Sequence, residues 1–183
     1  MSRFNRGSFC AVVAFLTLSP AKLALAGGPA APGAEAAAAF SVRLADEEAA
    51  RSVRRAVAGA HERLGREGCR EIFEAFRDPS RRTLNQNLAA LGTNGQGFLK
   101  QVLFYDGSAL AVCQPNPAKA VYAVTERGGR AVRVCARQFE AIQRKSPVLG
   151  EVVVIHEMLH ALGLGEAPPS SDEITWRVMA SCI

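Results

Sequence analysis

The sequence predicts one α+β domain in which helices come first, a small and mostly antiparallel sheet follows, and a buried helix near the C-terminus carries the reactive side chains. Three observations lead to this fold class. Apolar residues recur at helical spacing between residues 46 and 91, short apolar runs separated by turn residues occupy 98–136, and one apolar run at 152–166 holds two histidines and two glutamates. The chain of 183 residues is long enough for a single hydrophobic core.

The first 26 residues have the composition of a secretory signal peptide. Arg3 and Arg6 form a positively charged start, an apolar run spans 9–18, and Ala24-Leu25-Ala26 is a small-residue cleavage site. This apolar run covers about ten residues, whereas a membrane-spanning helix needs about twenty. We therefore expect cleavage after Ala26, a periplasmic or secreted mature protein, and no stable membrane span after cleavage.

The charge of the mature chain argues against nucleic acid as its partner. The full chain has a formal net charge of +5, but residues 1–26 hold three basic and no acidic residues, which leaves +2 for the remainder. So small a charge gives little attraction to a phosphate backbone. Residues 27–40 are nearly all Gly, Pro and Ala, so we expect a flexible segment there and a folded domain over 41–183.

Two helices are expected before the sheet. The acidic start Asp46-Glu47-Glu48 and a stripe of apolar residues predict a helix that ends near Leu64. Leucines at 84, 88 and 91 predict a second helix that stops at Gly92, and a short apolar element is expected over 69–76. We interpret the arginines and His61 of the first helix as solvated side chains, in preference to a binding patch or a metal ligand.

Four short apolar runs predict the strands of the sheet, and they span 98–105, 109–113, 120–125 and 130–136. Asp106-Gly107, which follows the first run, is typical of a hairpin turn. Residues 130–134 alternate between polar and apolar side chains, as in a sheet with one face in water.

The mature chain keeps four cysteines, and an even number in an exported protein predicts two disulfides. Four cysteines allow three pairings, and the sequence does not choose among them. We favour Cys113 with Cys135, which would join neighbouring strands, and Cys69 with Cys182, which would tie the C-terminus to the front of the domain. A structural zinc site is the alternative, but no two of these cysteines have the close spacing that such sites use.

The apolar run at 152–166 contains the sequence His156-Glu157-x-x-His160. On a helix, positions i and i+4 lie on one face, so both imidazoles can reach a single cation. Glu157 can then face a water activated by that cation, where a general base is needed. Gly163 permits the helix to end in a left-handed turn, after which Glu166 is the first side chain able to bind a metal.

Written out to Glu166, this segment resembles the zinc signature of the metzincins, a group of zincin-type zinc metallopeptidases, in which a third ligand follows the glycine by three residues. The resemblance implies a zincin-like domain in which His156, His160 and Glu166 bind one catalytic Zn²⁺. It also implies that an edge strand of the sheet pairs with an extended peptide substrate. Most metzincins have histidine where this chain has Glu166, although two histidines and one glutamate are a common catalytic zinc set.

An alternative third ligand is Glu173, on a last helix expected over about 172–180. In gluzincins, which are also zincins, the third ligand is a glutamate from a separate downstream helix. We favour Glu166 because it stands at the metzincin offset from Gly163. Met179 is comparable with the methionine that lies beneath the zinc in metzincins, or with an ordinary core methionine.

The sequence therefore predicts a small exported zinc metallopeptidase, with endopeptidase activity on peptide or protein substrates and with Glu157 as the general base. The alternative is a binding or structural module of the cell envelope, either without metal or with its zinc closed by a fourth protein ligand such as Asp172 or Glu173. Arg177 and Tyr122 have the right chemistry to stabilise an oxyanion.

Overall fold

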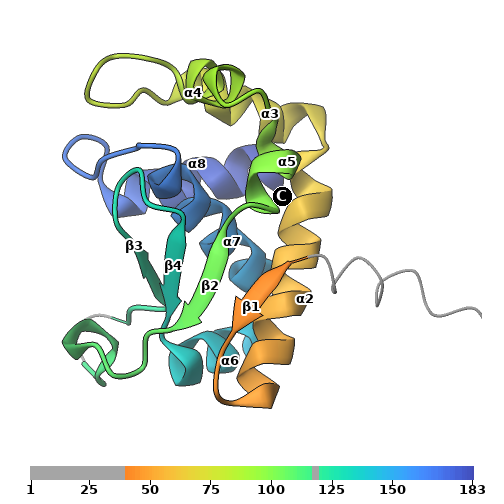
Figure 1. Ribbon diagram of the computed structural model, residues 1–183, viewed down its shortest axis with the longest axis vertical. Helices are drawn as coiled ribbons and strands as arrows, with labels where there is room; N and C mark the ends of the chain where they lie inside the picture. Colours follow the sequence, from red (N-terminus) through yellow and green to blue (C-terminus); the bar gives the residue numbers. More distant parts are fainter. Residues whose placement is uncertain (1–39, 117–119) are drawn as a thin grey trace, which may run out of the picture.

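The computed structural model describes residues 40–116 and 120–183, which form an α+β domain with seven α-helices and a four-stranded mixed sheet (Figure 1). The predicted signal peptide lies outside the described residues, and so does all of the predicted flexible segment except Phe40. Phe40 is buried in the core, and its ring centroid lies 5.6 Å from that of His61. The packed part of the chain thus includes the residue before Ser41.

The sheet has the strand order β1-β2-β4-β3, and its strands are β1 (Ser41–Arg43), β2 (Leu103–Asp106), β3 (Ala123–Thr125) and β4 (Ala131–Val134). β1 pairs with β2 in parallel, β2 pairs with β4 in parallel, and β3 alone runs antiparallel to its neighbour β4. The prediction of a mostly antiparallel sheet is therefore wrong. Helices connect β1 to β2, and such a crossover returns the chain in the same direction.

The expected hairpin at Asp106-Gly107 does not form. The Gly107 N–H donates to the carbonyl of Val134 on β4, 2.8 Å away, so β2 ends against a strand that is distant in sequence. The chain then enters a short 3₁₀ helix, η1 (Ala111–Cys113), where a strand was predicted. The first predicted strand is also shorter than expected, because Phe98 and Leu99 belong to the helix α5 (Gly95–Leu99), whose N-terminus the Asn94 side chain caps.

Capping residues explain where the two predicted helices begin. The Asp46 carboxylate accepts a hydrogen bond of 2.7 Å from the backbone N–H of Ala49 at the start of α2 (Glu47–Leu64). Thr83 and Gln86 form a reciprocal capping box at the start of α4 (Leu84–Ala90). The remaining helices are α3 (Glu67–Ala75), α6 (Ala136–Lys145), α7 (Pro147–Ala161) and α8 (Ser171–Cys182).

α7 is the central helix of the domain. It packs against α2, α6 and α8 and against strands β3 and β4, and residues 154–161 are all buried (Figure 1). A helix with neighbours on nearly every side has no need of a polar face, which accounts for the apolar sequence that precedes His156. One of its few polar side chains, Glu151, forms an ion pair with Arg63 of α2.

Both favoured disulfides are present. Cys69 of α3 is bonded to Cys182 of α8, and Cys113 of η1 is bonded to Cys135 at the start of α6. The pairing of Cys113 with Cys135 is confirmed, but it joins a 3₁₀ helix to a helix N-terminus and not two neighbouring strands. Within the described part of the chain, no helix is both long enough and apolar enough to span a membrane.

Candidate metal centre

α7 presents His156 and His160 one helical turn apart on the face that lies nearest to β3 and the start of α8. Both imidazoles are buried, with ring centroids 4.8 Å apart and ring planes inclined at 68°. Their Nε2 atoms lie 3.0 Å from each other. The two side chains therefore converge through the same ring nitrogen, as a shared metal ligand pair requires.

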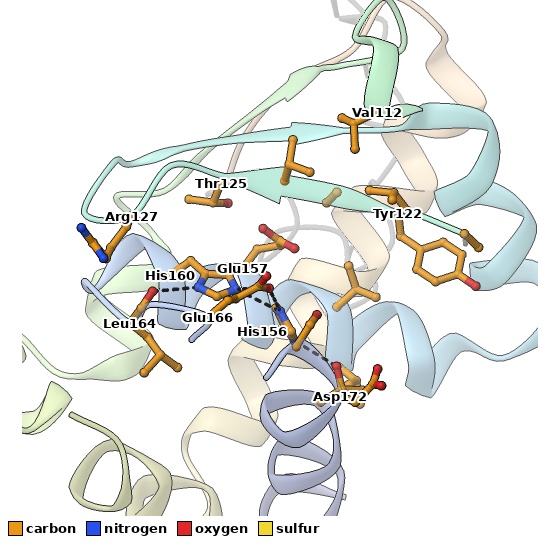
Figure 2. A pocket seen from close by; sticks show the side chains of 18 of the residues that line it. Val112, Tyr122, Thr125, Arg127, His156, Glu157, His160, Leu164, Glu166 and Asp172 are labelled. Carbon is orange, nitrogen blue, oxygen red and sulfur yellow. Dashed lines mark hydrogen bonds and ion pairs between the residues drawn. The ribbon is translucent and has the colours of Figure 1, made fainter. Parts of the chain in front are cut away.

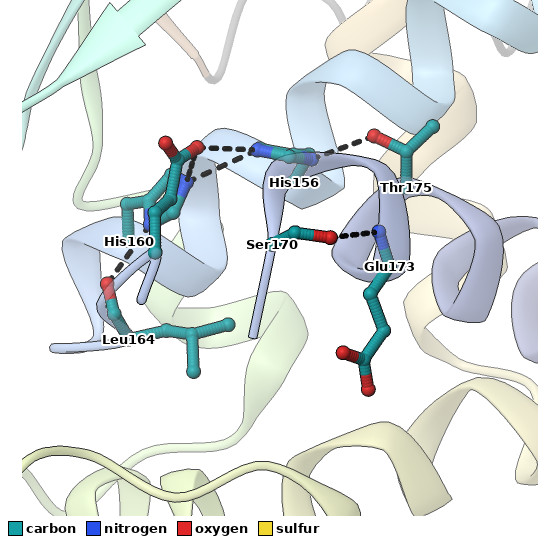
Figure 3. A network of polar contacts seen from close by, with 7 residues as sticks. His156, His160, Leu164, Ser170, Glu173 and Thr175 are labelled. Carbon is teal, nitrogen blue, oxygen red and sulfur yellow. Dashed lines mark hydrogen bonds and ion pairs between the residues drawn. The ribbon is translucent and has the colours of Figure 1, made fainter. Parts of the chain in front are cut away.

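The other ring nitrogen of each histidine has a partner of its own (Figure 3). Nδ1 of His160 lies 2.9 Å from the carbonyl oxygen of Leu164, and because a carbonyl only accepts, Nδ1 carries the proton. Nδ1 of His156 lies 3.0 Å from the hydroxyl of Thr175 on α8, which can accept in the same way. With both protons on Nδ1, both Nε2 atoms offer a lone pair to the same point.

The turn after α7 brings Glu166 back to the histidines. Gly163 has a φ of 109°, a conformation that favours glycine, and the Leu164 N–H donates to the Leu159 carbonyl over 3.0 Å. The Asn87 side chain of α4 donates to the carbonyl of Leu162, 2.9 Å away, and so holds the turn from outside. The direction in which the chain leaves α7 is thereby fixed.

Glu166 completes a group of three side chains whose donor atoms could hold a metal ion. Its Oε1 lies 3.2 Å from Nε2 of His160 and 3.6 Å from Nε2 of His156. In a tetrahedral zinc site with bonds of about 2.0–2.1 Å, neighbouring donors stand about 3.3 Å apart. The three observed separations scatter around that value, so the residues present fit a zinc ion without rearrangement of the backbone.

Glu173, the alternative third ligand, lies outside this group. Its carboxylate is half-exposed and accepts a hydrogen bond of 3.0 Å from Arg177, one turn further along α8. Its backbone N–H is bound by Ser170, the cap of the helix (Figure 3). The structure thus brings Glu166 and not Glu173 to the two histidines.

Glu157 is buried beside the three donors, and its Oε2 has no hydrogen-bond partner among the described residues. Burial raises the pKa of Glu157 above its usual range, an effect that the Thr125 hydroxyl and His160 oppose. Burial and, secondarily, the neighbouring His160 lower the pKa of His156 to about 4, although Glu166 opposes the shift. A buried carboxyl oxygen without a hydrogen-bond partner is costly unless it meets a ligand or a substrate.

These side chains line a cavity of about 600 Å³ (Figure 2). β3 forms one wall, α7 forms the floor, and the first turn of α8 closes one end. Val112, Tyr122 and Val153 make part of the lining apolar, whereas Arg127 and Asp172 are the charged side chains at its margins. The three candidate metal-binding side chains therefore line an open cavity, as the polar groups of a ligand site do.

Several sequence-based candidates lie elsewhere. Arg177 pairs with Glu173, and its guanidinium lies over the ring of Phe76, 5.3 Å from the centroid, so it does not line the cavity. Met179 is 43% exposed on α8, which places it neither beneath the histidines nor in the core. Tyr122 does line the cavity.

Four residues that surround or support the group were not predicted from the sequence, and they are Thr125, Arg127, Thr175 and Asn87. Single polar residues of this kind carry no spacing that sets them apart from solvated ones. Only Thr175 had a recognisable context, since it lies on the helix expected after the motif.

Comparison with family models found no matching family, and neither curated proteins nor solved structures gave a significant match.

Proposed function

We propose that the protein is an exported zinc metallopeptidase, in which His156, His160 and Glu166 bind one zinc ion and Glu157 acts as general base and acid. The observation that carries this proposal is the convergence of two Nε2 atoms and one carboxylate oxygen at the floor of an open cavity, beside a buried carboxyl group with one unpaired oxygen. Among hydrolytic metal sites, a set of two imidazoles and one carboxylate is typical of zinc.

A zinc ion held by these three residues would supply a Lewis acid that polarises a substrate carbonyl and lowers the pKa of a water molecule towards about 7. Glu157 takes the proton of the attacking water on its unpaired Oε2 and later gives it to the departing amine. His156 and His160 keep their orientation throughout, since Thr175 and Leu164 hold their Nδ1 atoms.

An extended peptide has a place to bind beside the metal group. β3 is the last strand in the sheet order, so within the described part of the chain its outer edge has no neighbouring strand. Its residues 123–125 line the cavity, and backbone groups at such an edge can pair with the backbone of an added strand. This arrangement supports a peptide substrate over a small metabolite.

A closed, non-catalytic zinc site receives less support from the same geometry. Such a site needs a fourth protein ligand, for which Asp172 and Glu173 are the nearest acidic residues in the sequence. Glu173 is held in its ion pair with Arg177, and Asp172 does not join the group of metal-binding side chains. Export is supported by the two disulfides, which form and persist in oxidising compartments.

The test is zinc-dependent cleavage by the purified, disulfide-bonded protein. A mixture of unstructured peptides is incubated with the zinc-loaded protein, with the chelated protein and with the Glu157→Gln variant, and the products are identified by mass spectrometry. The proposal expects new termini with the zinc-loaded protein only, while Glu157→Gln retains stoichiometric zinc. Stoichiometric zinc without any cleavage would instead favour the binding module.

A further inference from the structure

Arg127 is a charged side chain of the cavity, and none of the described residues, 40–116 and 120–183, forms a hydrogen bond or an ion pair with its guanidinium. Other arginines without a partner among the described residues, such as Arg43, Arg51 and Arg137, do not line the cavity. A cation that lines a substrate cleft without a protein partner is available to a ligand.

The turn that carries Arg127 is fixed to the metal-binding helix. Arg127 lies between β3 and β4, and the next residue, Gly128, donates its N–H to the carbonyl of His160 over 2.9 Å. Gly128 has a φ of 77°, and the Gly129 N–H closes the turn on the Glu126 carbonyl, 2.8 Å away. The position of Arg127 along the cleft is therefore tied to that of His160.

The guanidinium lies against the backbone that leads into Glu166. A Cβ atom added at Gly165 would stand 3.4 Å from Nη1 of Arg127, which is an ordinary contact distance, so the arginine lies beside this segment. Figure 2 shows Arg127 on one side of the histidines and Asp172 on the opposite side. The cleft is thus positive at the turn between β3 and β4, and negative at the start of α8.

From this arrangement we propose that Arg127 binds a carboxylate of the peptide substrate, and that the protein consequently prefers acidic peptides. This inference rests on the proposed function, because it names the substrate class of the same cleft. The planar guanidinium can bind both oxygens of a carboxylate, and Asp172 repels a carboxylate from the other end. The carboxylate belongs either to an acidic side chain or to the C-terminus of the peptide, which present the same chemistry.

The experiment measures peptide affinity in the zinc-loaded Glu157→Gln variant, so that binding is read without cleavage. A short fluorescent peptide carries a single Glu at each position in turn, with Gln at that position as its neutral match, and each version has a free or an amidated C-terminus. Fluorescence anisotropy gives the dissociation constants. The same set is measured after Arg127→Ala, after Arg127→Lys, and after Arg130→Ala as the control.

Arg130 is a suitable control because it is three residues further along the same turn but binds Gln101 and lies outside the cavity. We expect at least one carboxylate to improve affinity about tenfold or more. Arg127→Ala should abolish this advantage and leave the affinity of neutral peptides unchanged. Arg127→Lys should retain part of the affinity advantage of acidic peptides, and Arg130→Ala should retain all of it. An advantage confined to free C-termini identifies the terminal carboxylate, and one confined to Glu identifies the side chain.

The proposal is overturned if acidic and neutral peptides bind the parent equally, if the preference survives in Arg127→Ala, or if that variant weakens neutral peptides as much as acidic ones. If the preference for acidic peptides survives in Arg127→Ala, the peptide carboxylate binds the zinc ion and not Arg127. A cleavage assay on the wild type separates the proposed peptidase function from the proposed role of Arg127. Cleavage without carboxylate preference refutes only the role of Arg127, whereas an Arg127-dependent preference without cleavage refutes the peptidase.

Discussion

The Thr175 hydroxyl of α8 lies 3.0 Å from Nδ1 of His156 on α7, and so the last helix of the chain orients the first histidine of the candidate metal group. α8 is itself joined to α3 by the Cys69–Cys182 disulfide. The orientation of this imidazole therefore depends on contacts between segments that are far apart in the sequence.

Thr175→Val should weaken zinc binding roughly 10- to 100-fold, the usual effect of losing a hydrogen bond to a ligating histidine. Valine keeps the shape of threonine but cannot accept a hydrogen bond from Nδ1–H of His156. Thr175→Ser keeps the hydroxyl and should bind zinc nearly as the wild type does. Competition with a chromophoric chelator measures both affinities. Equal weakening in the two variants would mean that Thr175 acts through packing and not through its hydroxyl.

Glu166→Ala should weaken zinc binding by much more than about 100-fold, because on the proposed assignment it removes a direct ligand of the metal. Glu173→Ala should leave the affinity unchanged, since it removes only an exposed pair with Arg177. Zinc content after dialysis against graded chelator distinguishes them. If Glu166→Ala retains its zinc while Glu173→Ala loses it, the third ligand is Glu173 of α8.

Gly163→Ala should destabilise the fold by about 1–3 kcal/mol and also weaken zinc binding, because the φ of 109° is unfavourable for alanine and the turn positions Glu166. Gly92→Ala is the matched control: Gly92 also has a positive φ, of 64°, but nothing lies within 4 Å of an added Cβ. The control should lose stability without losing zinc affinity. Chemical denaturation and chelator competition report the two quantities, and unchanged zinc affinity in Gly163→Ala would refute the role of the turn.

The two disulfides should differ in their contributions to the free energy of unfolding. Cys69 and Cys182 are separated by 113 residues, whereas Cys113 and Cys135 are separated by 22. Loop-closure entropy then predicts that removing the first bridge costs about 1.4 kcal/mol more than removing the second. Urea denaturation of the two double-serine variants measures the difference. An equal cost, or free thiols at these four positions in the denatured unreduced protein, would contradict this expectation.

The parts of the fold that could be predicted from the sequence are those decided by nearby residues. The helix from Glu47 to Leu64 has its capping residue and its apolar stripe within its own segment, so both of its bounds are recognisable. The turn at Gly163 favours a glycine because of its local φ, and this glycine together with the metzincin-like spacing led us to favour Glu166 over Glu173.

The parts that were predicted wrongly depend on distant partners. Asp106-Gly107 has the composition of a hairpin turn, but β2 pairs with β4 in parallel, and only the tertiary arrangement decides this. α6 was not predicted, and its buried side chains include the polar Gln143, which lies against the backbone of Gly150. Arg127 and Thr175 reach the cavity through the turn after β3 and the packing of α8, neither of which has a signature in the sequence.

The most direct test of the account is the position of zinc in crystals of the protein, located by anomalous scattering at the zinc absorption edge. We expect one strong peak at about 2.0–2.2 Å from Nε2 of His156, Nε2 of His160 and one carboxylate oxygen of Glu166, with Glu157 outside bonding distance and the fourth position open to the cavity. Absence of the peak from zinc-soaked crystals, a peak bound by Glu173, or a fourth protein ligand closing the site would contradict it.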